Sequence, residues 1–376
     1  MARRAIFEEV AGAERAPVRA GGIDGARAGG RLAVRAWLAV LFALVVVMIA
    51  VGGLTRLTDS GLAITEWRPV TGALPPLSAE AWQSEFDLYR SIPEYQLQNR
   101  GMSLEEFKTI YWWEWGHRQL GRVIGLVWAV GFVALLATRR IPPGWTGRLL
   151  GLGALGGLQG AIGWWMVASG LEGTMLDVAS YRLAVHLGLA FVILSLIAWF
   201  MLSMSRPAAG LMQARRLAEP RLMTLGSVLI AAIFVQILIG ALVAGIDAGR
   251  NYPDWPLMAG GLTPPGMWAI EPWWRNLFEN DGTVQFVHRM WGYALLAGIV
   301  AAWWAARRSP HRGTRAAFMG VMHMAILQVV LGIVTVMHSS PWHLAIVHQS
   351  GAVVLIVLAV RARHRAKYPL PQSVRA

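Results

Sequence analysis

GGLTRLTDSGLAITEW (residues 52–67) and GALVAGIDAGRNYPDW (residues 240–255) are two copies of one segment. The copies align without a gap. Five matched positions carry the likeness: Gly52, Leu54, Asp59, Gly61 and Trp67 in the first copy, and Gly240, Leu242, Asp247, Gly249 and Trp255 in the second. Each copy ends an apolar run, and each is followed by a Pro-Pro pair. An internal repeat of this kind predicts two tandem units of similar architecture.

Apolar runs on either side of these copies set the fold class. The chain has 376 residues, of which 56% are hydrophobic and 15% charged. Eight runs are long enough to cross a hydrocarbon core of ~30 Å: 34–54, 117–137, 148–169, 181–203, 222–246, 286–306, 316–337 and 342–360. Such segments are helices, because lipid offers the backbone no hydrogen-bond partner. We expect an all-α integral membrane protein with eight transmembrane helices in two tandem, pseudo-symmetric four-helix bundles.

The formal net charge of +13 is unevenly distributed between the two sides of these helices. One side holds 23 of the 34 Lys and Arg residues, whereas the other holds 11 of them and 16 of the 21 acidic residues. Because positive residues are retained inside, both termini are expected to be cytoplasmic, and loops 55–116 and 247–285 to face outward. This pattern excludes a nucleic-acid-binding surface as the reason for the charge.

The repeat and the charge together divide the chain into four parts. We expect a disordered basic cytoplasmic tail over 1–33, an N-terminal bundle over 34–205, a C-terminal bundle over 222–362 and a basic cytoplasmic tail over 363–376. The first residues lack the apolar core of a signal peptide. The chain has no cysteine, which excludes disulfides and thiolate metal sites.

Each unit carries two histidines at matched places. HRQLG and HRMWG supply His117 and His288, and LAVH and LAIVH supply His186 and His348. All four are expected near the outer ends of their helices. A lone intramembrane histidine is more often a packing residue, but a repeated pair indicates function. Facing imidazoles in a four-helix bundle are axial ligands for heme iron.

An acidic residue accompanies only the first pair. Ser103 and Glu106 form a capping box, so one helix is expected to begin near residue 104 and run on into the membrane. On it Glu114 lies three residues before His117 and therefore on the same face, whereas the equivalent position before His288 is Gln285. This difference favours a reactive pocket in the first bundle and a redox cofactor in the second. The alternative is that Glu114 pairs with Arg118.

Other polar and small residues leave alternatives open. Arg118 and Arg289 each follow a histidine, and either bind heme propionates or reach into the headgroup region. Asp59 and Asp247 either clamp an arginine or, the favoured interpretation, cap a short outer helix. Several glycines would let a flat macrocycle approach the backbone or would simply allow close helix packing: Gly156, Gly157, Gly160, Gly163 and Gly332.

The remaining histidines carry weaker expectations. His311 and His364 are expected to be solvated in basic inner segments. No role is assigned to His323, His338 or His343.

With these motifs the chain resembles the heme A synthase family over about residues 35–362, and its lack of cysteine fits the proteobacterial and mitochondrial-like branch without an outer-loop cysteine pair. The most specific stretch is GGLTRLTDSGLAITEWRPVTGALPP (52–76). The resemblance implies oxidation of the C8 methyl group of heme O to a formyl group, through a gem-diol, with oxygen from water. The product would be heme A.

The resemblance also implies a role for each motif residue. His288 and His348 would ligate a resident heme b, His117 and His186 would hold the substrate heme O, and Glu114 would serve the reacting carbon. The expected setting is a bacterial inner membrane, with its lipid around the helices and the heme sites toward the periplasm. Heme O synthase is a candidate for direct contact, and a heme-copper terminal oxidase would receive the product.

Two other functions are compatible with paired histidines. One is a diheme b-type membrane electron-transfer protein, and the other is a heme-delivery or transport protein without turnover. The oligomeric state and the electron acceptor stay open.

Overall fold

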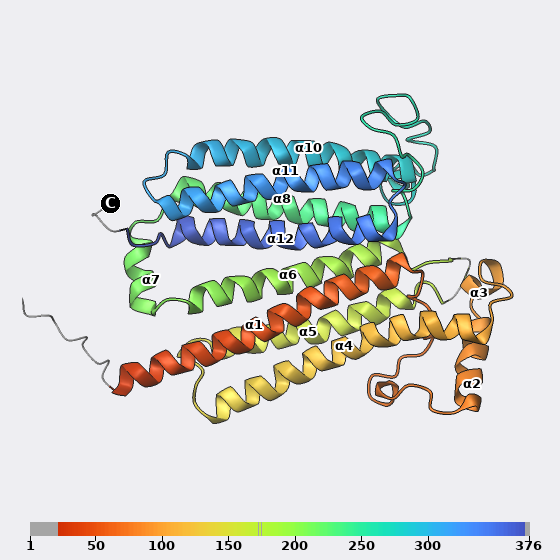
Figure 1. Ribbon diagram of the computed structural model, residues 1–376, viewed down its shortest axis with the longest axis horizontal. Coiled ribbons are helices and arrows are strands. Elements are labelled where there is room, and N and C mark those ends of the chain that lie inside the picture. Colours follow the sequence, from red (N-terminus) through yellow and green to blue (C-terminus); the bar gives the residue numbers. More distant parts are fainter. Residues whose placement is uncertain (1–21, 172, 174, 373–376) are drawn as a thin grey trace, which may run out of the picture.

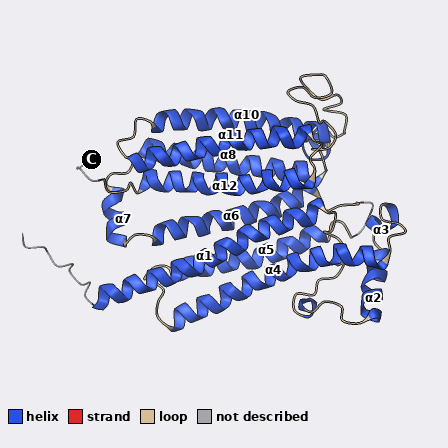
Figure 2. Cartoon of the chain, viewed as in Figure 1, coloured by secondary structure: helices blue, strands red, loops and turns tan. Residues whose placement is uncertain are grey.

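The structure is a computed structural model that describes residues 22–171, 173 and 175–372. Its regular elements are helices, with no strand among these residues beyond one isolated bridge between Met258 and Gly261 (Figure 2). The α-helices are α1 (Gly22–Leu57), α2 (Ala79–Arg90), α3 (Pro93–Leu97), α4 (Leu104–Ala137), α5 (Thr146–Val167), α6 (Ser180–Met204), α7 (Ala208–Arg215), α8 (Pro220–Gly245), α9 (Asn276–Glu279), α10 (Asp281–Ala306), α11 (Arg312–Met337) and α12 (Trp342–Lys367). Two 3₁₀ turns, η1 (Thr71–Ala73) and η2 (Trp273–Arg275), lie in the loops.

Seven helices of the described part are long and apolar enough to cross a membrane: α1 over Gly29–Leu57, α4, α5, α6, α8, α11 and α12. They fit a multi-pass membrane protein. The expected span 286–306 falls in α10, which is as long as α8 but is not among the seven. Its Arg289 and its three tryptophans (Trp291, Trp303 and Trp304) lower its mean hydropathy.

The long helices form two neighbouring groups (Figure 1). In the first, α1 and α5 each pack against both α4 and α6. In the second, α8 and α11 each pack against both α10 and α12. The groups meet where α6 contacts α8 and α12, and where α1 contacts α12. One apolar core, from Val34 to Ala366, runs through both groups.

The two large loops lie at the same end of the helices (Figure 1). The loop with α2 and α3 and the loop after α8 are both at this end, which we call the loop end. The start of α1 and the end of α12 lie at the opposite end. This common placement follows from the even number of long helices in each group.

Helix α4 shows how the first loop is fixed to the membrane part. It begins at Leu104 behind the predicted capping box, in which the Ser103 hydroxyl accepts from the Glu106 amide (3.3 Å) and Glu106 accepts from the Ser103 amide (2.7 Å). This prediction is confirmed. The first turns of α4 extend beyond the span, and Phe107 and Tyr111 pack there with Tyr89 in a loop-end core.

The helices at both chain ends are longer than expected. Helix α1 begins at Gly22 and not near residue 34, and α12 continues to Lys367 and not to residue 360. Residues 1–21 of the predicted tail lie outside the described residues. The prediction that His364 is solvated is wrong, because its side chain is 2% exposed. Its ring lies 5.0 Å from the rings of both Trp199 and Tyr368.

Candidate functional site

The four matched histidines come from alternate helices of the two groups. His117 lies on α4 and His186 on α6, while His288 lies on α10 and His348 on α12. The structure brings the second pair together, with ring centroids 6.5 Å apart and ring planes at 74°. Two imidazoles that each hold one iron from about 2 Å have centroids roughly 6 Å apart. The second pair therefore has the spacing of a bis-histidine heme site.

Each histidine ring packs against a glycine of a neighbouring helix. A Cβ atom added at the glycine would lie about 3 Å from the ring, tighter than most side-chain contacts, so the ring would have to shift. The distances are 3.0 Å from Gly52 to His117, 2.8 Å from Gly163 to His186, 3.1 Å from Gly240 to His288 and 3.1 Å from Gly332 to His348. Since Gly52 matches Gly240 and Gly163 matches Gly332, the two sites are built alike.

These glycines refine the expectation for small residues. Gly163 and Gly332 serve as backing for a histidine. Gly156, Gly157 and Gly160 have nothing within 4 Å of an added Cβ, so the structure does not bring them against a ring. Gly52 and Gly240 were visible in the repeat, but their contact with the histidines requires the packing of α1 on α4 and of α8 on α10.

The donor set fits a heme in the second group. The two imidazoles face each other from α10 and α12, and the buried His348 Nδ1 has no hydrogen-bond partner among the described residues. A buried polar atom without a partner is rare in proteins and indicates a missing ligand or a shift on binding. In the first group, each ring instead packs against its own glycine, His117 against Gly52 and His186 against Gly163.

Glu114 is buried at the loop end of α4, with 2% of its surface exposed. Its Oε2 accepts from the Ile64 amide (2.6 Å), and its Oε1 accepts from Arg118 Nη2 (2.6 Å) and Nε (3.0 Å). The predicted alternative, an ion pair with Arg118, is therefore formed. It holds the carboxylate one helical turn from His117 and against the loop.

Gln285 occupies the matching place in the second group. Its Oε1 accepts from Arg289 Nη2 (2.7 Å) and its Nε2 donates to the Ala248 carbonyl (2.7 Å). The two arginines are matched as well, because Arg118 donates to the Ile64 carbonyl (2.6 Å) and Arg289 to the repeat-equivalent carbonyl of Tyr252 (2.9 Å). Both arginines thus fasten a loop to a histidine-bearing helix, a role that the sequence did not reveal.

Asp59 and Asp247 clamp an arginine. Arg56 Nη1 lies 2.8 Å from Asp59, and its Nη2 lies 3.1 Å from Asp247 and 3.4 Å from Asp177. The favoured interpretation, that these aspartates cap a short outer helix, is wrong. Both adopt a left-handed backbone (φ 48° and 50°), so the repeat preserves a turn that places a carboxylate at the junction of the two groups.

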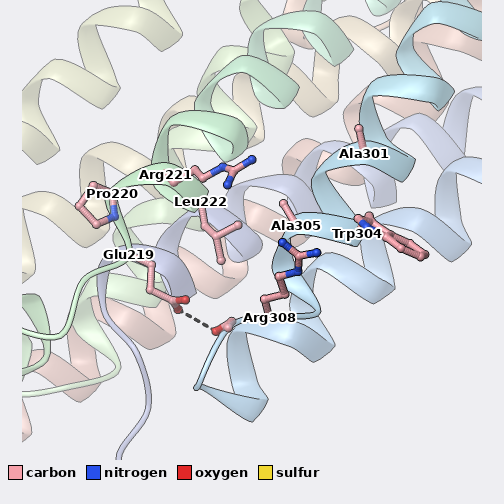
Figure 3. Close-up of a pocket in the computed structure, with 9 residues that line it drawn as sticks. Glu219, Pro220, Arg221, Leu222, Ala301, Trp304, Ala305 and Arg308 are labelled. Carbon is pink, nitrogen blue, oxygen red and sulfur yellow. Dashed lines mark hydrogen bonds between the residues drawn. The ribbon is translucent and has the colours of Figure 1, made fainter.

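His311 lies apart from the four matched histidines, at the opposite end of the helices. His311 Nδ1 lies 3.1 Å from Glu219 Oε1, and both side chains are largely buried, so the prediction of a solvated His311 is wrong. Glu219 also accepts from Ser309 at the edge of a cavity that contains Arg221 and Arg308 (Figure 3). That cavity lies between the start of α8 and the end of α10, opposite the loop end, and contains none of the predicted site residues.

Comparisons with known proteins agree over nearly the whole chain. A family model described as cytochrome oxidase assembly protein (COX15-CtaA) matches residues 35–360. The chain is 65% identical to a heme A synthase of Dinoroseobacter shibae, over 99% of this chain and 98% of that protein. It is 64% identical to one of Jannaschia sp., with the same coverage, and 58% identical to one of Paracoccus denitrificans, over 100% and 99%.

Proposed function

The chain belongs to the cytochrome oxidase assembly protein (COX15-CtaA) family, and from this premise we propose that it is a heme A synthase. The reaction is the oxidation of the C8 methyl group of heme O to a formyl group, with the oxygen taken from water. It removes four electrons and four protons from the methyl carbon and one water. The enzyme is then an oxidoreductase that acts on a CH group.

The observation that carries this proposal is the unequal duplication of one site. Both groups keep two histidines backed by matched glycines, but only the first has a carboxylate, Glu114, in the place of Gln285. A carrier or transporter gives no reason for this difference. An enzyme does, because the first site holds the substrate and the second holds a resident cofactor.

The residues divide the work accordingly. His117 and His186 hold the iron of heme O, which places the porphyrin next to α4. His288 and His348 hold a heme b, which when bound supplies a route for electrons from the first site to an acceptor. Arg118 and Arg289, already fixed to loop carbonyls, would pair with the heme propionates through their guanidinium groups.

Glu114 acts on the reacting carbon. Loss of electrons from a methyl group on an aromatic ring leaves positive character on that carbon, and a fixed carboxylate stabilises it. The same carboxylate accepts a proton from the attacking water. Two donors already orient it, the Ile64 amide and Arg118, so little reorganisation is needed when charge develops.

The setting of the reaction is part of the proposal. Helix α10 is the eighth span, because it packs between α8 and α11 and its histidine and arginine face the site. The chain is a tandem eight-span protein of a bacterial inner membrane with cytoplasmic termini, so both heme sites lie toward the periplasm. Heme O synthase delivers the substrate, and a heme-copper oxidase receives the product.

Analysis of the bound hemes tests the function. The protein is expressed with a heme O synthase, purified, and its hemes are extracted and identified by mass and absorption. A formylated porphyrin is expected. Unmodified heme alone would contradict the proposal and favour a heme carrier or an electron-transfer protein. Both histidine pairs lie at one end of the helices, which argues against electron transfer across the membrane.

A further inference from the structure

Three of the four histidines are held by a glutamine from the neighbouring helix. In each case the glutamine Nε2 donates to the main-chain carbonyl of the histidine. The distances are 3.0 Å from Gln159 to His186, 3.0 Å from Gln236 to His288 and 2.9 Å from Gln328 to His348. Gln236 Nε2 also lies 3.2 Å from both ring nitrogens of His288, and Gln159 Nε2 lies 3.2 and 3.3 Å from those of His186, so each of these amides restrains a ring as well as the backbone.

For the fourth histidine, His117, the matching position of the repeat is a methionine and not a glutamine. Met48 and Gln236 are repeat counterparts, each four residues before a glycine that backs a histidine. The structure confirms the match. Met48 Cε lies 3.6 Å from a Cβ added at Gly121, and Gln236 Nε2 lies 3.4 Å from a Cβ added at the equivalent Gly292. The two side chains therefore fill one position of the duplicated architecture.

The exchange of an amide for a thioether removes a hydrogen-bond donor from the neighbourhood of the histidine. A glutamine amide donates hydrogen bonds, whereas the methionine sulfur has no hydrogen to donate and its side chain is flexible. In the second group both ligands have a glutamine. In the first group only His186 has one, so His117 is the one histidine of the four without a glutamine hydrogen bond in the described part of the chain.

We infer that position 48/236 sets how long each site keeps its heme. This inference rests on the proposed function. Gln236 slows the release of heme from the second site, as is needed for a cofactor that stays bound. Met48 leaves His117 free to release the iron. The first site requires such release because it must exchange substrate for product in every cycle. Met48 and Gln236 are thus positioning residues, because they act through a histidine.

Reciprocal substitutions test the inference through heme release. Protein loaded with heme is mixed with excess apomyoglobin, and transfer is followed optically without turnover. The fast phase is assigned to the first site by its loss in His186→Ala. Met48→Gln is expected to slow this phase by roughly three- to tenfold, the effect of one hydrogen bond. Gln236→Met is expected to accelerate the slow phase by a similar factor.

Two controls keep the result specific. Met48→Leu has a similar volume and no donor, so it should release heme at the rate of the unmodified protein. Thermal unfolding of each variant shows whether the fold is intact. Unchanged release in both Met48→Gln and Gln236→Met, in folded protein, would overturn the inference. Because no turnover is involved, a protein that makes no heme A would refute the proposed function, while reciprocal shifts in release would still support this inference.

Discussion

Single residues show why the carboxylate of the first site serves chemistry. Glu114 and Gln285 both accept from an arginine four residues later, and both bind a loop main-chain group. An amide therefore performs the structural task of this position without difficulty. It follows that folding does not require the negative charge of Glu114, which is buried at 2% exposure, where an ion is costly.

Removal of a ligand of the second pair is a direct test of the histidine assignment. His288→Ala or His348→Ala deletes one of two rings whose centroids are 6.5 Å apart, so the iron would lose one axial ligand. We expect the low-spin absorption spectrum of the resident heme to disappear in either variant. An unchanged low-spin spectrum would show that these residues do not bind the iron.

Glu94, in the loop-end core, makes stability depend on pH. Burial raises the pKa of Glu94 from 4.5 to about 8, and the carboxylates of Asp177, Glu114 and Asp59 add to the shift. The folded protein therefore binds more protons than the unfolded chain between these two values, so stability falls as pH rises through this window. Glu94→Gln should raise the apparent Tm by several degrees at pH 8 and leave it almost unchanged at pH 5.

A comparison within the loop gives the control for this prediction. Glu85 lies 2.8 Å from Arg68 and keeps a partner for its charge, so Glu85→Gln should not produce a gain that grows with pH. An equal Tm for Glu94→Gln and the unmodified protein at pH 8 would contradict the assignment of a raised pKa.

The sequence predicts residues well where a repeat marks them. All four histidines, and the contrast between Glu114 and Gln285, are visible from spacing alone. His364 was misplaced because a basic sequence suggests solvent, whereas α12 carries this ring between Trp199 and Tyr368. The contacts that a side chain makes with other helices cannot be predicted from the sequence of its own helix.

At the scale of elements, the fit of one helix on another positions each ring. On α5, an added Cβ at Gly163 would lie 2.8 Å from His186, whereas one at Gly151 would meet nothing within 4 Å. Gly163→Val should displace His186, at about 1–3 kcal/mol of overpacking, and abolish heme binding at the first site. Gly151→Val should leave the heme content unchanged, and equal loss in both would refute the backing role.

Elements were predictable where local chemistry defines them. The start of α4 could be predicted because the two hydrogen bonds of its capping box involve only four consecutive residues. The short helices α2 and α3 were missed, because their burial comes from contacts with α4 in the loop-end core. The early start of α1 was missed because residues 22–31 contain no apolar run. Within this extension Gly30 lies against the Arg140 carbonyl, which an added Cβ would approach to 2.6 Å.

At the scale of the whole molecule, Arg56 joins the two groups. It lies at the end of α1, is 11% exposed, and binds Asp59 of its own group and Asp247 of the other. Its three carboxylate partners are 34–41% exposed, so solvent screening reduces the cost of losing this cluster to about 1–3 kcal/mol, between the values for exposed and buried pairs. Arg56→Ala should therefore lower the apparent Tm by several degrees and reduce the heme content of both sites.

Arg250 provides the matched control for this junction. It also reaches Asp247, at 3.4 Å, but is 47% exposed, and exposed pairs contribute at most about 1 kcal/mol. Arg250→Ala should change the Tm by no more than a degree or two. Equal effects of the two substitutions would show that Arg56 does not hold the groups together.

The architecture of two similar units was predictable from the repeat, but the contact between them was not. Gln349 Nε2 donates to the Ile49 carbonyl (2.7 Å) and lies against Gly53, where a Cβ would approach the amide to about 2.5 Å. Gln349 corresponds to Leu187 and Gly53 to Ala241 in the other copy. An interface between copies breaks the symmetry that made the copies recognisable.

The heme products of Glu114→Gln and Gln285→Glu test the central claim most directly. Both variants and the unmodified protein are expressed with a heme O synthase, purified, and their hemes extracted and quantified. We expect Glu114→Gln to retain its hemes and contain no formylated product, and Gln285→Glu to produce heme A. Heme A in Glu114→Gln at the level of the unmodified protein would contradict the account.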